Sequence, residues 1–247
     1  MSAHHHAGGL LAALAGLSCL AAAGCAAGNA ATAALHGHSG SHGSSGASGG
    51  TPAVASTVIP AQLGDTWVYA VDSSALGRGT ETARISAVTP AAGGQHATLS
   101  TSLRLAGAKA ALKFAADFTV GADGSVTFRS ASFNGAKVAS ANANWPSPAT
   151  LTPGQPRTST VTEDFLGFKT TEHVAVTEVG PATVTVPAGT YQATLLEQAI
   201  TDGPGSQSVI KAWVVNGIGQ VKTETTIVVK GEREVSTAQE LLSFTKG

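Results

Sequence analysis

The chain has 247 residues, a formal net charge of −1 and 43% hydrophobic residues. Lysine and arginine are scattered singly, which argues against a nucleic-acid-binding surface. The two cysteines, Cys19 and Cys25, both lie near the N-terminus, and no Asp, Glu, Lys or Arg occurs before Asp65. The remainder of the chain therefore has no disulfide and depends on packing and strand pairing for its stability.

The N-terminal segment is a short apolar run that ends in Ala22-Ala23-Gly24-Cys25. It resembles a bacterial lipoprotein signal, in which a diacylglycerol is attached to the cysteine and signal peptidase II cleaves before it. The run is rich in Ala and Gly, which suits a signal segment better than a stable membrane span. Residues 1–24 are therefore predicted to be a signal peptide. Ordinary secretion and an uncleaved anchor are the alternatives.

The resemblance implies that the mature protein begins at Cys25 and is anchored by lipid at the outer face of the cell membrane. Residues 25–56 consist mainly of Ala, Gly, Ser and Thr with a few His. Such a segment has too little apolar surface to fold, so it is predicted to be a flexible linker. His36, His38 and His42 could bind a metal through imidazole, but a flexible chain offers no fixed geometry, and no metal site is predicted.

Residues 57–247 show the alternation of apolar and polar residues that is typical of β-strands. The clearest strands are 96–105 and 112–120, and the second is followed by an Asp123-Gly124 turn. We count about ten strands and no convincing long helix. The prediction is one all-β domain, a curved antiparallel sheet or half-barrel.

Two further hairpins are predicted in the C-terminal half of the chain. Strands 182–187 and 190–200 meet across Pro187-Ala188-Gly189, and strands 208–215 and 218–229 meet across Asn216-Gly217. An Asn-Gly pair favours a two-residue turn with positive φ at both positions. Residues 141–157 contain four prolines and are expected to form a long irregular connection.

Three segments together resemble the secreted bacterial proteins labelled DUF3108-like. They are Pro60–Tyr69, which reads P-x-x-x-G-D-T-W-V-Y, and the pair Thr183–Tyr191 and Trp213–Lys222, which matches a "VPAGTF … WFxxGVGLVK" ending. The resemblance covers roughly residues 57–245. It implies a half-barrel like that of the LolA-like lipoprotein carriers of bacterial envelopes, and it implies no catalytic residue.

The first hypothesis is a non-enzymatic binding protein whose apolar concave face holds a lipid-like or amphiphilic ligand. The large apolar side chains expected to line the groove are Trp67, Tyr69, Phe114, Phe118, Trp145 and Trp213. The connection 141–157 could act as a lid. The alternative is a structural or partner-docking module, because inward-facing residues of a cavity and of a packed core look identical in sequence. No cofactor and no nucleic-acid partner are expected, and the sequence identifies no protein partner.

Overall fold

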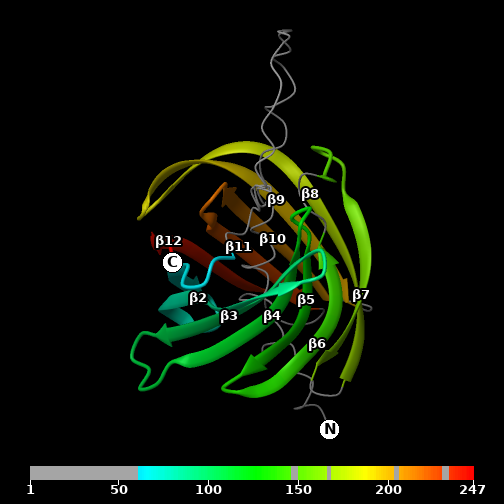
Figure 1. The fold of residues 1–247 in the computed structure, drawn as a ribbon. Helices are drawn as coiled ribbons and strands as arrows, with labels where there is room; N and C mark the ends of the chain where they lie inside the picture. Colours follow the sequence, from blue (N-terminus) through cyan, green and yellow to red (C-terminus); the bar gives the residue numbers. More distant parts are fainter. Residues whose placement is uncertain (1–60, 146–149, 166–167, 203–205, 230–233) are drawn as a thin grey trace, which may run out of the picture.

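The computed structural model describes residues 61–145, 150–165, 168–202, 206–229 and 234–247 (Figure 1). The predicted signal peptide, Cys25 and the linker 25–56 lie outside the described residues. The described part of the chain folds into twelve antiparallel strands. They are β1 (Thr66–Ser73), β2 (Gly77–Ala91), β3 (Gly94–Leu105), β4 (Leu112–Gly121), β5 (Val126–Phe133), β6 (Ala136–Trp145), β7 (Arg157–Phe165), β8 (Phe168–Val186), β9 (Gly189–Asp202), β10 (Ser206–Val215), β11 (Gly219–Val229) and β12 (Val235–Thr245).

Each strand pairs with the next strand in sequence, and β1 also pairs with β12, so the strand order closes into a barrel. The shortest pairing between neighbouring strands is that of β6 with β7, which share three residue pairs. The predicted all-β class and curved antiparallel sheet are confirmed. The strands number twelve, against the expected ten. The segment 141–157 is also not irregular throughout, because β6 extends to Trp145 and β7 begins at Arg157.

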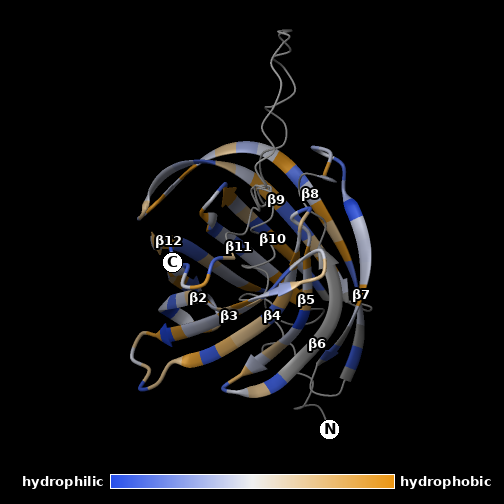
Figure 2. Cartoon of the chain, viewed as in Figure 1, coloured by the Kyte–Doolittle hydropathy of each residue, from blue (hydrophilic) through white to orange (hydrophobic). Residues whose placement is uncertain are grey.

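Alternation of side chains explains why these residues form strands that bury one face. In β4, Phe114, Ala116, Phe118 and Val120 are buried, whereas Lys113 and the other intervening residues are more exposed. Figure 2 shows hydrophobic and hydrophilic residues alternating along many of the strands. The inward residues of the barrel are therefore set by the period-2 pattern of the sequence.

The turns correct one prediction and confirm others. Gly217 has φ +77°, but Asn134 is the one non-glycine residue with positive φ in the described part, so the expected positive φ at Asn216 is wrong. The reason is the loop length: β10 and β11 pair at Val215 and Gly219, which leaves a three-residue loop. A two-residue Asn-Gly turn with positive φ at both positions occurs instead between β5 and β6, at Asn134-Gly135 (φ 49° and 85°).

The β4–β5 and β8–β9 hairpins are confirmed, with tight turns at Asp123-Gly124 and after Val186. Figure 1 shows the β8–β9 hairpin arching over one side of the barrel toward β12. Its tip is fixed there because the Ala188 N–H donates a hydrogen bond to the Leu241 carbonyl (3.0 Å).

The buried apolar side chains of the described residues form three clusters, and the partly buried Phe133 packs against two of them. The first and largest fills the end of the barrel at the β2–β3, β4–β5 and β10–β11 turns, and includes Trp67, Tyr69 and Phe118. The second cluster lies on β4, β5, β7 and β8: Ala116, Phe128, Ala131, Val161 and Val174. The third cluster lies toward the opposite end, on β1, β3 and β4: Val71, Leu103 and Phe114.

Candidate functional site

The aromatic residues of β1 are fixed across the interior of the barrel. The Trp67 indole N–H donates to the Ile218 carbonyl (2.6 Å), and the Tyr69 hydroxyl donates to the Gln220 carbonyl (2.9 Å). The Trp67 ring also lies 5.4 Å from the Phe244 ring, centroid to centroid. Trp67 and Tyr69 therefore join β1 to the β10–β11 turn and the start of β11, and they fill the first cluster.

The other predicted groove residues are distributed over different parts of the barrel. Phe118 shares the first cluster with Trp67, whereas Phe114 belongs to the third cluster. Trp145 ends β6 opposite Val126, and its side chain lies outside the described part. The structure therefore brings Trp67, Tyr69 and Phe118 together and places Phe114 in a separate region.

Trp213 differs from the rest because it lies on the other face of its strand. It alternates in β10 with the buried Ala212 and Val214, and it is half-buried. The Lys222 ammonium lies 5.2 Å from the centre of its ring and pairs with Glu224 (3.0 Å). The ring and the ammonium form a cation–π contact at the partly exposed surface.

Polar side chains also point into the barrel, and the sequence analysis did not single them out. We define the inner polar stripe as Glu81 on β2, Gln239 on β12, Thr223 and Thr225 on β11, and Gln198 on β9. None of these residues is more than 9% exposed. Gln239 stands opposite Thr223, and Thr225 is linked to Gln198 through the intervening Ile210 of β10. The stripe therefore crosses one wall of the barrel.

Glu81 is the ionisable member of the inner polar stripe and is 2% exposed. The Gln239 side-chain amide donates a hydrogen bond to its Oε2 atom (3.0 Å). Burial raises the pKa of the Glu81 carboxyl from 4.5 to about 7, and the hydrogen bond from Gln239 acts in the opposite direction. At neutral pH this group therefore exists in both protonation states.

Three buried atoms of the inner polar stripe have no hydrogen-bond partner within the described part of the chain. They are Glu81 Oε1, Gln198 Nε2 and Thr223 Oγ1. A buried polar atom left without a partner is unfavourable by about 1–3 kcal/mol, and native proteins pair most such atoms with protein groups or water. Each of the three atoms therefore lacks the hydrogen bond that a buried polar group usually makes.

A signal for this stripe is present in the sequence. Glu81 shares its strand face with Ala83 and Ile85, and Gln239 shares its face with Leu241. A charged residue at an inward position of an alternating strand is uncommon, because burial of a charge is unfavourable. Such a residue is a better indicator of a site than the aromatic residues that the sequence analysis chose.

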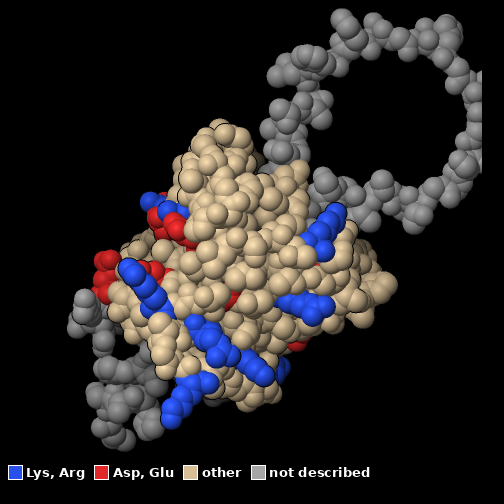
Figure 3. Space-filling view, turned by 90° about the vertical axis from the view of Figure 1, so that its left-hand side faces the viewer, with Lys and Arg blue, Asp and Glu red and all other residues tan. Residues whose placement is uncertain are grey.

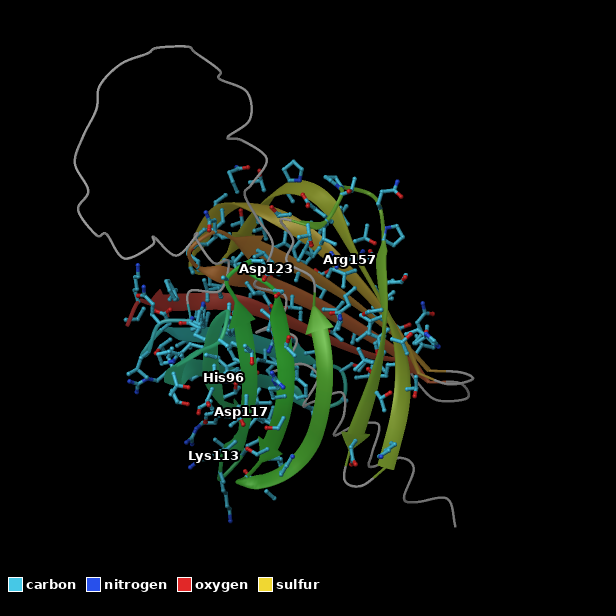
Figure 4. The ribbon with its side chains drawn as sticks, turned by 45° about the vertical axis from the view of Figure 1, so that its right-hand side comes forward. His96, Lys113, Asp117, Asp123 and Arg157 are labelled. Atoms are coloured by element: carbon cyan, nitrogen blue, oxygen red, sulfur yellow. The ribbon has the colours of Figure 1, made fainter. Side chains whose placement is uncertain are left out.

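The described charged groups at the surface, unlike Glu81, are exposed to solvent or make hydrogen bonds between neighbouring strands. Figure 3 shows lysine and arginine side chains spread over one face of the barrel. On the outer face of β3–β5, Asp117 accepts hydrogen bonds from the hydroxyls of Thr98 (2.7 Å) and Ser130 (2.9 Å), and His96 bonds to Thr119 (2.8 Å). Figure 4 shows His96, Lys113 and Asp117 along this part of the sheet. These contacts join neighbouring strands.

Within the described ranges, no group of three or more His, Cys, Asp or Glu side chains is arranged to hold a metal ion. The same ranges contain no helix that is long and apolar enough to cross a membrane.

Comparison with known proteins gives similarity at the level of the fold. No family model matches the chain, and no curated protein matches it. A crystal structure of a protein provisionally described as a lipoprotein, from Parabacteroides distasonis, has a TM-score of 0.51 at 14% sequence identity and covers 75% of this chain and 97% of its own. The described residues therefore share a fold with this protein.

Two further structures show weaker similarity. An exported protein with a YmcC-like fold from Bacteroides fragilis has a TM-score of 0.49 at 17% identity, over 75% of this chain and 97% of its own. The hypothetical lipoprotein YmcC from Escherichia coli has a TM-score of 0.37 at 8% identity, over 77% of this chain and 88% of its own. All three proteins are described as lipoproteins or as exported.

Proposed function

We propose that this protein is a cell-envelope lipoprotein, anchored at the outer face of the cell membrane through lipid on Cys25, that binds an amphiphilic ligand inside its barrel. The N-terminal segment before Cys25 supports the anchoring. The fold shared with a protein described as a lipoprotein agrees with it. We propose a binding role and no catalytic role.

The observation that carries the proposal is the division of the barrel interior. The described inward-facing side chains include both the apolar clusters, two of which are joined through Phe133, and the buried polar side chains of the inner polar stripe. A barrel of eight strands has an interior that its own side chains can just fill, and a barrel of twelve strands is wider. Many inward side chains are small: Ala83, Ala97, Ala116, Ala131 and Ala212. Mostly apolar walls with a few polar groups are typical of small-molecule sites.

We also propose kinship with the DUF3108-like proteins. The residues that carry this resemblance contact one another: Trp67 of the first segment donates its hydrogen bond to Ile218 of the last. The Pro187-Ala188-Gly189 segment is fixed to β12 through Ala188. The segments are thus fold determinants at one end of the barrel, which is the role that a family motif without catalytic residues would have.

The proposal is tested by native mass spectrometry of the mature protein purified from its own membrane in a mild detergent. We expect a non-covalent adduct of lipid mass, at one per barrel, that survives exchange into a second detergent. An unrelated lipoprotein from the same preparation controls for adventitious lipid. If no such adduct is found and no amphiphile binds on titration, the ligand-binding proposal is wrong and a docking module becomes the better account.

A further inference from the structure

We propose that the inner polar stripe is the headgroup site of the ligand, and that it selects an uncharged, hydroxyl-bearing headgroup, such as that of an acylglycerol, against an anionic one. This inference rests on the proposed function, because it concerns the same barrel interior. It goes further in naming the chemical class of the ligand and the residues that recognise it.

The hydrogen-bonding capacity of the stripe matches hydroxyl groups. Gln198 Nε2 is a donor, Thr223 Oγ1 can donate or accept, and Glu81 Oε1 accepts when the carboxyl is ionised. A ligand that satisfies all three must offer both donors and acceptors. Gln239 bonds to Glu81 and stands opposite Thr223, whereas Gln198 lies two strands further along the barrel wall. A headgroup with more than one hydroxyl group, each of which donates one hydrogen bond and can accept another, can pair with the stripe at more than one point.

The charge distribution disfavours an anionic headgroup. In the described part of the chain, every lysine and arginine side chain is exposed or half-exposed, and none is buried. Glu81 is the charged residue of the inner polar stripe, so a phosphate or carboxylate placed beside it would meet a like charge with no buried cation to compensate. Like charges held together away from water repel each other strongly.

The apolar clusters provide surface for the acyl part of such a ligand. The stripe lies on β9, β11, β12 and β2, whereas the second cluster lies on β4, β5, β7 and β8. Phe133 packs against both the second and the third cluster and is only partly buried. Acyl chains buried against these residues would contribute through the hydrophobic effect. Hydroxyl recognition on one wall and apolar surface on the other form an amphipathic interior.

The test uses a matched pair of probes that differ by one phosphate: monomyristoylglycerol and its phosphorylated form, myristoyl lysophosphatidate. Each is titrated into the mature protein held in amphipol at pH 8, and bound probe is counted by native mass spectrometry. We expect the wild-type protein to prefer the uncharged probe by at least about tenfold.

Two variants assign the preference to the stripe. Glu81→Gln removes the charge and keeps an acceptor, so the preference for the uncharged probe should shrink severalfold through tighter binding of the phosphorylated probe. Thr223→Val should weaken binding of the uncharged probe about fivefold, because one hydrogen bond is lost. Asp72→Asn and Thr80→Val, both on exposed positions of β1 and β2, are the matched controls and should change neither affinity.

The outcomes separate the two proposals. Equal binding of both probes, with no effect of Glu81→Gln or Thr223→Val, would overturn the headgroup inference and leave the binding function intact. Absence of binding by either probe and by any other amphiphile would overturn the binding function itself.

Discussion

Replacing Glu81 with glutamine should change how the stability of the domain depends on pH. The buried carboxyl accepts a hydrogen bond from Gln239, and the carbonyl oxygen of a glutamine at this position can accept the same bond. The substitution keeps the volume of the side chain and removes its ability to ionise. It therefore isolates the unfavourable burial of a charge from the packing of the residue.

The size of this pH-dependent change in stability follows from the pKa of Glu81 in the folded and in the unfolded protein. The pKa of Glu81 is about 7 in the folded protein and 4.5 as the ordinary value for the unfolded chain. Because the folded state binds the proton more tightly, the stabilisation is complete below about pH 4.5 and is lost as the pH rises through about 7. The two pKa values differ by about 2.5, and each pKa unit corresponds to about 1.4 kcal/mol. The wild-type protein should thus lose about 3 kcal/mol between pH 4.5 and pH 8 through this residue.

The assay is thermal unfolding of the wild-type protein and of Glu81→Gln between pH 4.5 and pH 8. A domain of this size gains roughly 2–4 °C in Tm per kcal/mol, so at pH 8 the variant should melt about 6–12 °C higher than the wild type. At pH 4.5 the two should melt within a few degrees of each other. Asp72→Asn, an exposed carboxylate beside Arg78, should parallel the wild type. A difference between wild type and Glu81→Gln that is the same at both pH values would refute the reasoning.

Three other substitutions and one proteolysis experiment test separate parts of the chain. Gly135→Val places a β-branched residue at φ 85° and should lower the Tm by several degrees, whereas an unchanged Tm would contradict the two-residue turn. Trp67→Phe removes the hydrogen bond to Ile218 and should lower the unfolding free energy by about 1 kcal/mol in denaturant titration, and a neutral result would argue against that bond. Cys25→Ser should block lipid attachment and shift the protein out of the membrane fraction, and a wild-type mature form that is water-soluble would contradict the anchor. Limited proteolysis should first cut within residues 26–56 and leave a resistant fragment that begins near Thr57.

The strands could be predicted because burial in this fold repeats every second residue. In β4 the alternation of Phe114, Ala116 and Phe118 with polar residues identifies both the strand and its inward face. The turns were less predictable: Asn216-Gly217 and Asn134-Gly135 carry the same dipeptide, yet only the second forms the two-residue turn. Which one does so depends on the register of the flanking strands, and that register is set by tertiary pairing.

The candidate site could not be predicted from the aromatic residues, because a large apolar side chain does not by itself show which face of its strand is inward. In β10 the inward face carries Ile210, Ala212 and Val214, so alternation places Trp213 on the other face. Closure of the barrel could not be predicted from local sequence patterns either, because it pairs β1 with β12, the first and the last strand in the sequence. Glu81 can be recognised in the sequence as a charged residue at an inward position of an alternating strand. Its hydrogen bond with Gln239 depends on tertiary structure, because the two residues are far apart in the sequence.

The inward-facing side chains differ in whether their polar atoms are hydrogen-bonded within the protein. Trp67 and Tyr69 have their polar atoms bonded to the backbone of the β10–β11 connection and β11, so these aromatic residues close one end of the barrel and have no polar atom that a ligand is needed to satisfy. Glu81, Gln198 and Thr223 are also buried, and each has a polar atom without a hydrogen-bond partner among the described residues. A stable fold tolerates few such atoms. Trp67 and Tyr69 therefore explain the fold at this end of the barrel, and the residues that break the apolar pattern of the interior are where the function is to be sought.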